Sequence, residues 1–113
     1  MALTIAQLFA PVQLPASAAV LFTMPTSPST SVLKNGRVRL TNTSGSAVPV
    51  TLYAAASGTA SGVANCCLSA VSIAANGYLD VDIPTMTAGD TLRGFAGTGS
   101  VITMHELGGV LYS

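Results

Sequence analysis

Short runs of β-branched and aromatic residues follow one another along this chain, and Gly, Pro, Asn and Ser interrupt them every 8 to 12 residues or so. Within many runs apolar and polar side chains alternate, which is typical of a strand with one buried face. The segment 64–75 fits either a short helix or a strand, and we favour an irregular piece that leads into a strand. The pattern predicts strands at 19–24, 32–41, 48–55, 68–73, 78–83, 91–96 and 101–107.

Turn residues between these runs predict how the strands pair. Residues 42–46 (Asn-Thr-Ser-Gly-Ser) combine Asx and glycine chemistry, and they predict a hairpin between the strands on either side. Asn76-Gly77 has the sequence of a two-residue type I′ turn and predicts a second hairpin. Asn35-Gly36 is either another tight turn or a β-bulge inside a strand.

Many short strands without a convincing helix indicate an all-β fold. We expect an antiparallel β-sandwich of seven to eight short strands, with jelly-roll or immunoglobulin-like topology. Periodicity leaves the choice between these two topologies open. A chain of 113 residues without an internal repeat fits one domain. We assign residues 1–18 to an extended arm or first strand and 19–113 to the sandwich.

Charge is scarce in this chain. Only 7% of the residues are charged and the net charge is zero, whereas an average soluble domain carries roughly 25% charged residues. Most of the folded surface must therefore consist of small polar and apolar side chains. Zero net charge also removes the repulsion that keeps copies apart. This composition predicts that the protein works as part of an assembly, and we expect it to form a homo-oligomer.

The apolar content does not predict a membrane protein, because no run approaches the roughly 18 to 20 uninterrupted apolar residues that span a bilayer. A cleaved secretion signal is not expected either. No Lys or Arg precedes Lys34, and Pro11 and Pro15 interrupt the apolar N-terminal segment. Adjacent Cys66 and Cys67 cannot form a disulfide framework, and we expect them to behave as small buried apolar groups. The composition indicates synthesis in a reducing cytoplasm.

No arrangement of titratable residues predicts catalysis, a metal site or a cofactor. Asp80 and Asp82 share one face of a predicted strand, but no third group stands near them in the sequence. We expect these carboxylates to form ion pairs with Arg37 and Arg39. The two arginines are balanced by acids, so a nucleic-acid partner is not expected. His105 is the single histidine and lacks a nucleophile motif nearby.

The N-terminal segment offers a candidate assembly contact. Leu3, Ile5, Leu8 and Phe9 are apolar and precede Pro11. An extended arm of this kind can add a strand to the open sheet edge of a neighbouring subunit. Alternatively, the segment is the first strand of its own sandwich.

Five segments carry a resemblance to a known group of proteins: Thr-Met-Pro at 23–25, Arg-Val-Arg-Leu-Thr-Asn-Thr-Ser-Gly at 37–45, Val-Thr-Leu-Tyr at 50–53, Val-Ser-Ile-Ala-Ala-Asn-Gly at 71–77 and Ala-Gly-Asp-Thr-Leu-Arg at 88–93. Together they resemble small virion proteins of tailed bacteriophages. The resemblance covers residues 19 to 113 and implies a structural, non-enzymatic protein that forms a symmetric oligomer on the particle. It brings no catalytic residues. We expect a capsid decoration (cement) protein that binds the major capsid protein; the alternatives are a tail or fibre-associated virion protein and a carbohydrate-binding adhesive module.

Overall fold

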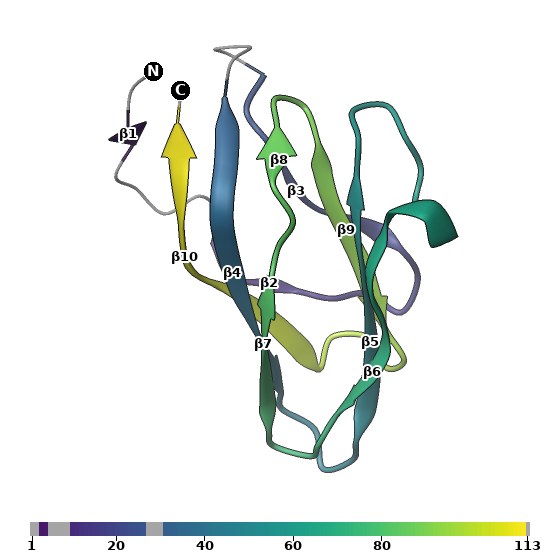
Figure 1. Cartoon of the computed structure of the whole chain (residues 1–113). Coiled ribbons are helices and arrows are strands. Elements are labelled where there is room, and N and C mark those ends of the chain that lie inside the picture. The colour runs from purple at the N-terminus through teal and green to yellow at the C-terminus, as the bar shows by residue number, and fades with distance from the viewer. Residues whose placement is uncertain (1–2, 5–9, 27–30, 113) are drawn as a thin grey trace.

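The computed structural model of the protein describes residues 3–4, 10–26 and 31–112. Two antiparallel sheets pack face to face (Figure 1), which confirms the predicted β-sandwich. Seven strands in the described part of the chain are longer than two residues, in agreement with the predicted number. The elements are β1 (Leu3–Thr4), β2 (Val12–Gln13), β3 (Ala19–Thr23), β4 (Val32–Asn42), β5 (Val48–Ala55), η1 (Val63–Asn65), β6 (Cys66–Ile73), β7 (Tyr78–Asp82), β8 (Met86–Thr87), β9 (Thr91–Ala96) and β10 (Ile102–Tyr112).

The sheets are named here after a central strand of each. The β4 sheet has the order β1-β10-β4-β7, and β2 and β8 extend its two edges by pairing with β10 and β4. The β5 sheet has the order β3-β9-β5-β6. The only helical element in the described residues is the three-residue 3₁₀ turn η1, and no helix there is long and apolar enough to cross a membrane.

The pairing of strands follows a nested order along the chain. The first strands, β1 and β2, pair with the last, β10; β3 pairs with β9, β4 with β7 and β8, and β5 with β6. This is the arrangement of one long hairpin rolled into two sheets, which is the jelly-roll topology. The structure therefore selects the jelly roll from the two topologies that the periodicity left open.

The predicted hairpin at residues 42–46 is wrong, because β4 and β5 lie in different sheets. Asn42 is fully buried and anchors the crossing. Its Nδ2 donates to the carbonyl of Ser46 at 2.8 Å and to that of Ile73 at 3.0 Å, while its Oδ1 accepts from the backbone N–H of Ser44 at 2.9 Å. These bonds satisfy backbone groups that a ladder would otherwise pair, so the linker changes layers at little cost.

The hairpin predicted around Asn76-Gly77 is also wrong, since β6 belongs to the β5 sheet and β7 to the β4 sheet. A tight turn does form: the N–H of Gly77 donates to the carbonyl of Ala74 at 2.9 Å, and Asn76 has a φ of 55°. This turn bonds to the other crossing, from Asn76 N–H to Ser44 O at 3.1 Å and from Asn42 N–H to Gly77 O at 2.8 Å. The two crossings together close one end of the sandwich.

Asn35-Gly36 is a bulge inside β4 and not a turn. The register between β4 and β10 shifts at this point, and Asn35 has a φ of 56°. On the opposite strand, Gly109 has a φ of 146°, and a Cβ there would lie 3.0 Å from the Cα of Gly36. The close approach of two glycines lets β10 continue to Tyr112, beyond the strand end that we predicted at residue 107.

The core lies between the two inner faces, and both sheets contribute to it. Alternate residues of β4 and β5, such as Leu40 and Leu52, are fully buried. The alternation predicted from the sequence thus sets which face of each strand points inward. The residues between these core positions point outward, and they determine what the molecule presents to its surroundings.

Candidate functional site

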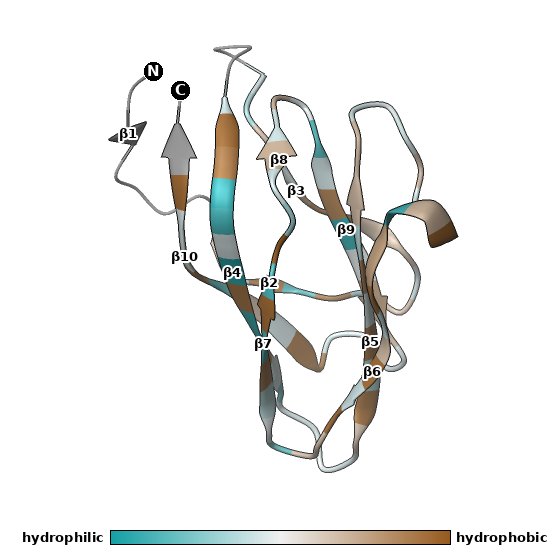
Figure 2. Ribbon diagram, in the orientation of Figure 1, coloured by the Kyte–Doolittle hydropathy of each residue, from teal (hydrophilic) through white to brown (hydrophobic). Residues whose placement is uncertain are grey.

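Charged residues are distributed unequally between the two sheets. Six of the eight lie in strands of the β4 sheet, Asp90 lies in the turn before β9, and Arg93 alone lies in a strand of the β5 sheet. Figure 2 shows a strongly hydrophilic band on β4, whereas β5 is mostly brown or pale. The six are Lys34, Arg37, Arg39, Asp80, Asp82 and Glu106.

The structure brings together the four residues expected to form ion pairs, on the outer face of the β4 sheet. Arg39 and Asp80 are cross-strand partners; Nε and Nη2 of the guanidinium donate to the two carboxylate oxygens at 2.8 and 3.1 Å. The guanidinium also lies 4.3 Å from the ring centroid of Tyr78. The hydrogen bonds from Arg39 lower the pKa of Asp80, and the same bonds raise the pKa of Arg39.

The second pair is weaker. Arg37 and Asp82 are also cross-strand partners, but Nε lies 3.4 Å from Oδ1 and the side chains are 55% and 89% exposed. An exposed pair at this distance adds little to stability, because water and salt screen it. Both arginines already have an acidic neighbour, so the β4 sheet satisfies these charges within its own surface.

The outer face of the β5 sheet has a different chemistry. Since Leu52 and Leu92 are fully buried, the residues next to them in β5 and β9 point outward. Thr51 is registered with Phe95 and Tyr53 with Arg93, and the rings of Tyr53 and Phe95 stack at 6.4 Å between centroids and an angle of 25°. We call this surface the aromatic face, defined by Pro49, Thr51, Tyr53, Arg93 and Phe95.

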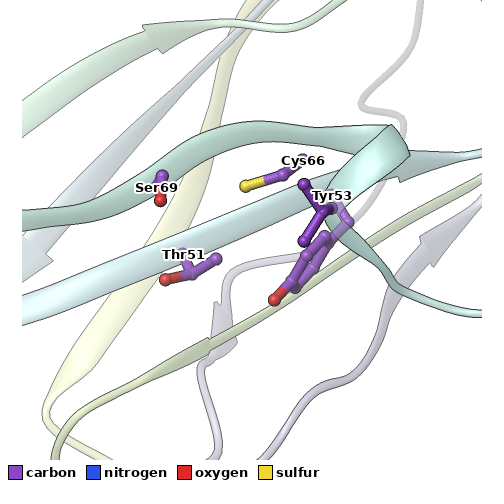
Figure 3. A pocket seen from close by; sticks show the side chains of 5 residues that line it. Thr51, Tyr53, Cys66 and Ser69 are labelled. Atoms are coloured by element: carbon purple, nitrogen blue, oxygen red, sulfur yellow. The ribbon is translucent and has the colours of Figure 1, made fainter.

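An open groove of about 390 Å³ lies beside the aromatic face. Figure 3 shows Thr51 and Tyr53 from β5 next to Cys66 and Ser69 from β6. The fifth lining residue, Val63 of η1, is 96% exposed. Two register shifts in β6 move its backbone out of regular pairing beside the groove. The groove therefore combines hydroxyl groups with an apolar rim and contains no charged side chain.

The two cysteines are free and only partly buried, so the expectation of two buried thiols is too strong. Cys66 lines the groove, while Cys67 packs against the core. Burial raises the pKa of Cys67, and the neighbouring Cys66 adds to that shift. A raised thiol pKa lowers the fraction of reactive thiolate near neutral pH.

The N-terminal candidate contacts are placed only in part. The backbone of Leu3 belongs to β1, which pairs with β10 of its own sheet, with Leu3 opposite Tyr112. Ile5, Leu8 and Phe9 lie outside the described residues. Farther along, β2 pairs with β10 and Leu14 is fully buried. The segment 12–14 is thus part of the sandwich, before the domain start that we assigned at residue 19.

Sequence reasoning missed the aromatic face. Tyr53 and Phe95 are far apart in the chain, and the usable signal was the absence of charge in the strand 48–55.

His105 is exposed on β10 opposite Arg39. Within residues 3–4, 10–26 and 31–112, no group of three or more His, Cys, Asp or Glu side chains is arranged to hold a metal ion. No protein-family model, curated protein or solved structure matches the chain.

Proposed function

We propose that this chain is a non-enzymatic structural protein of a bacteriophage particle, a capsid decoration (cement) protein that binds the major capsid protein. The observation that carries the proposal is the outer surface of the β5 sheet, where two aromatic rings and one arginine occur without any other charged strand residue. Cores of protein interfaces are depleted in charge and enriched in aromatic residues and arginine. A free surface of this composition favours contact with another protein.

The jelly-roll fold is compatible with this role but adds modest support. Viral capsid proteins use the fold, and so do lectins and cupins, so it allows an argument by analogy only. The stronger support is the combination of this surface with the resemblance of residues 19 to 113 to small virion proteins.

A decoration protein works by repetition. A contact of about 800 Å² per partner is large enough to be specific, and an oligomer that engages several capsid subunits at once gains further affinity. With few charges at the contact, few ions lose their hydration shell on docking. The ion pairs of the β4 sheet would then remain on the solvent side, after the protein leaves the host cytoplasm as part of the particle.

The copy number of the protein in purified particles tests this function. Quantitative mass spectrometry of particles made from the genome that encodes this chain should find copies on the scale of the major capsid protein. A number far below that scale would favour the tail or fibre-associated alternative. Absence of the protein from particles would contradict both.

One observation favours a different function, a carbohydrate-binding adhesive module. The stacked Tyr53 and Phe95 lie beside a groove lined by the exposed Ser69 and by the buried Thr51, whose hydroxyl accepts a hydrogen bond from the backbone N–H of Ala70 at 3.1 Å. Aromatic rings with nearby hydroxyl groups are suited to sugars, which have apolar faces and polar edges. Binding of the isolated protein to a glycan array, lost on Tyr53→Ala, would support this candidate over decoration.

A further inference from the structure

Arg93 differs from the arginines of the β4 sheet in having no carboxylate partner among the described residues. Its Nε donates to the hydroxyl of Thr91 at 3.0 Å, which leaves the other N–H donors of the guanidinium available. The nearest acid in sequence, Asp90, accepts hydrogen bonds from the backbone N–H groups of Thr87 and Ser57. The β5 sheet has no acidic residue in any of its strands.

The groove begins one strand away from this arginine, because its lining residues come from β5, β6 and η1 while Arg93 lies in β9. Tyr53 lines the groove and is the cross-strand partner of Arg93, so the ring connects the two features. Val63, which also lines the groove, exposes 96% of its surface. A cation with available donors and a groove with an apolar rim therefore lie on neighbouring strands of the same sheet face.

We propose that Arg93 and the groove form one recognition site for a segment of a different protein. The segment presents a carboxylate next to an aliphatic or aromatic side chain. The carboxylate accepts bidentate hydrogen bonds from Arg93, and the apolar side chain fills the groove between Tyr53 and Val63. The inference rests on the proposed function to the extent that this segment belongs to the major capsid protein.

Charge complementarity favours a different protein over a second copy of this chain. A two-fold contact brings the same patch of both subunits together. Here it would place Arg93 against a face without a carboxylate, so the cation would lose water without gaining a partner. A homo-oligomer of this protein is then expected to use other surfaces.

Selection from a yeast-displayed library of random peptides tests the chemistry of the site. On the immobilised wild-type protein, we expect enrichment of peptides with Asp or Glu beside an apolar residue. With Arg93→Glu, the enriched acid should be replaced by Lys or Arg, and the wild-type peptides should bind at least about tenfold more weakly in calorimetry. Val63→Asp should remove the preference for the apolar residue.

The matched control is Arg37→Glu, which makes the same substitution on the opposite face and should leave the selected peptides unchanged. Thermal unfolding confirms that each variant is folded, and the exposure of Val63 makes its substitution tolerable. Two results would overturn the inference. One is that the peptides selected on the wild-type protein share no acidic residue beside an apolar one, and the other is that Arg93→Glu selects the same peptides as the wild type. Either result leaves the copy number in particles as a separate measurement, so the two failures can be told apart.

Discussion

The two sheets have similar inner faces and opposite outer faces. Inside, Leu40 of the β4 sheet and Leu52 of the β5 sheet are both fully buried. Outside, the β4 sheet carries two cross-strand ion pairs, whereas the β5 sheet carries a stacked aromatic pair and a single arginine. Folding constrains the inner faces, because they must fill one core. The outer faces are free of that constraint, and under the proposed function their difference corresponds to a docked face and a solvent face.

Under the proposed function, the ion pairs would make the β4 sheet the poorer docking surface. Arg39 already donates two hydrogen bonds to Asp80, and a partner would have to displace them. Arg93 offers donors without such competition from a carboxylate in the described chain. The charges of Arg37 and Arg39 are thus balanced within the β4 sheet, whereas the charge of Arg93 has no carboxylate partner among the described residues.

The largest expected effect tests the claim that the inner faces are equivalent. Leu40→Ala and Leu52→Ala each remove a fully buried side chain, one from each sheet. Each should lower the free energy of unfolding by about 2 to 5 kcal/mol, through lost burial and the cavity left behind. Urea unfolding measures both. A loss below about 1 kcal/mol for one of them would show that the two sheets do not share one core.

The linker between β4 and β5, which crosses from one sheet to the other, should be the next most sensitive feature for stability. Asn42→Ala removes the side-chain amide that donates to the carbonyls of Ser46 and Ile73. The loss should lower the free energy of unfolding by about 1 to 3 kcal/mol. Ala47→Ser, in the same linker but exposed, is the control and should change stability by less than about 0.5 kcal/mol. Equal unfolding midpoints for the two variants would mean that Asn42 does not hold the crossing.

The aromatic face should add a smaller amount to stability. A double-mutant cycle with Tyr53→Leu and Phe95→Leu isolates the ring contact from simple apolar burial. We expect a coupling of about 0.5 to 1.5 kcal/mol from chemical unfolding. A coupling near zero would indicate that the rings are retained for a partner and not for the fold.

The ion-pair face should have the smallest effect, visible mainly in acid. The folded-state pKa of Asp80 lies below its unfolded value, because Arg39 binds the charged carboxylate. The pair therefore stabilises the fold above the unfolded pKa, about 3.9, and this contribution is lost as the pH falls through the lowered folded value. Thermal unfolding against pH should show a shallower acid dependence for Asp80→Asn than for the wild type. Asp80→Asn and wild type with superimposable acid profiles would contradict this assignment.

Strand positions could be predicted from the sequence because they depend on local alternation. The strands at 48–55 and 91–96 agree with the structure at both ends. Strand pairing could not be predicted in the same way. Residues 42–46 have a sequence suited to a hairpin, yet the buried Asn42 bonds to Ile73 of a distant strand and carries the chain into the other sheet. A local turn pattern contains no information about that distant carbonyl.

In the candidate site too, local alternation predicts some features, and others depend on strand pairing. Arg37 and Arg39 alternate with Val38 and Leu40, so the sequence already implies that both arginines leave the core. That each meets one particular aspartate depends on the register between β4 and β7. The neighbourhood of Tyr53, Phe95 and Arg93 depends in turn on the pairing of β5 with β9.

Residue order alone thus established an all-β sandwich, its inward and outward positions, and a surface poor in charge, because each of these follows from local periodicity and composition. Folding produced the jelly-roll order, the separation of ionic and aromatic surfaces, and the pairing of Arg93 with Tyr53, which lines the groove. They depend on which distant strands become neighbours, and that choice is made by packing of the whole core and by buried hydrogen bonds such as those of Asn42.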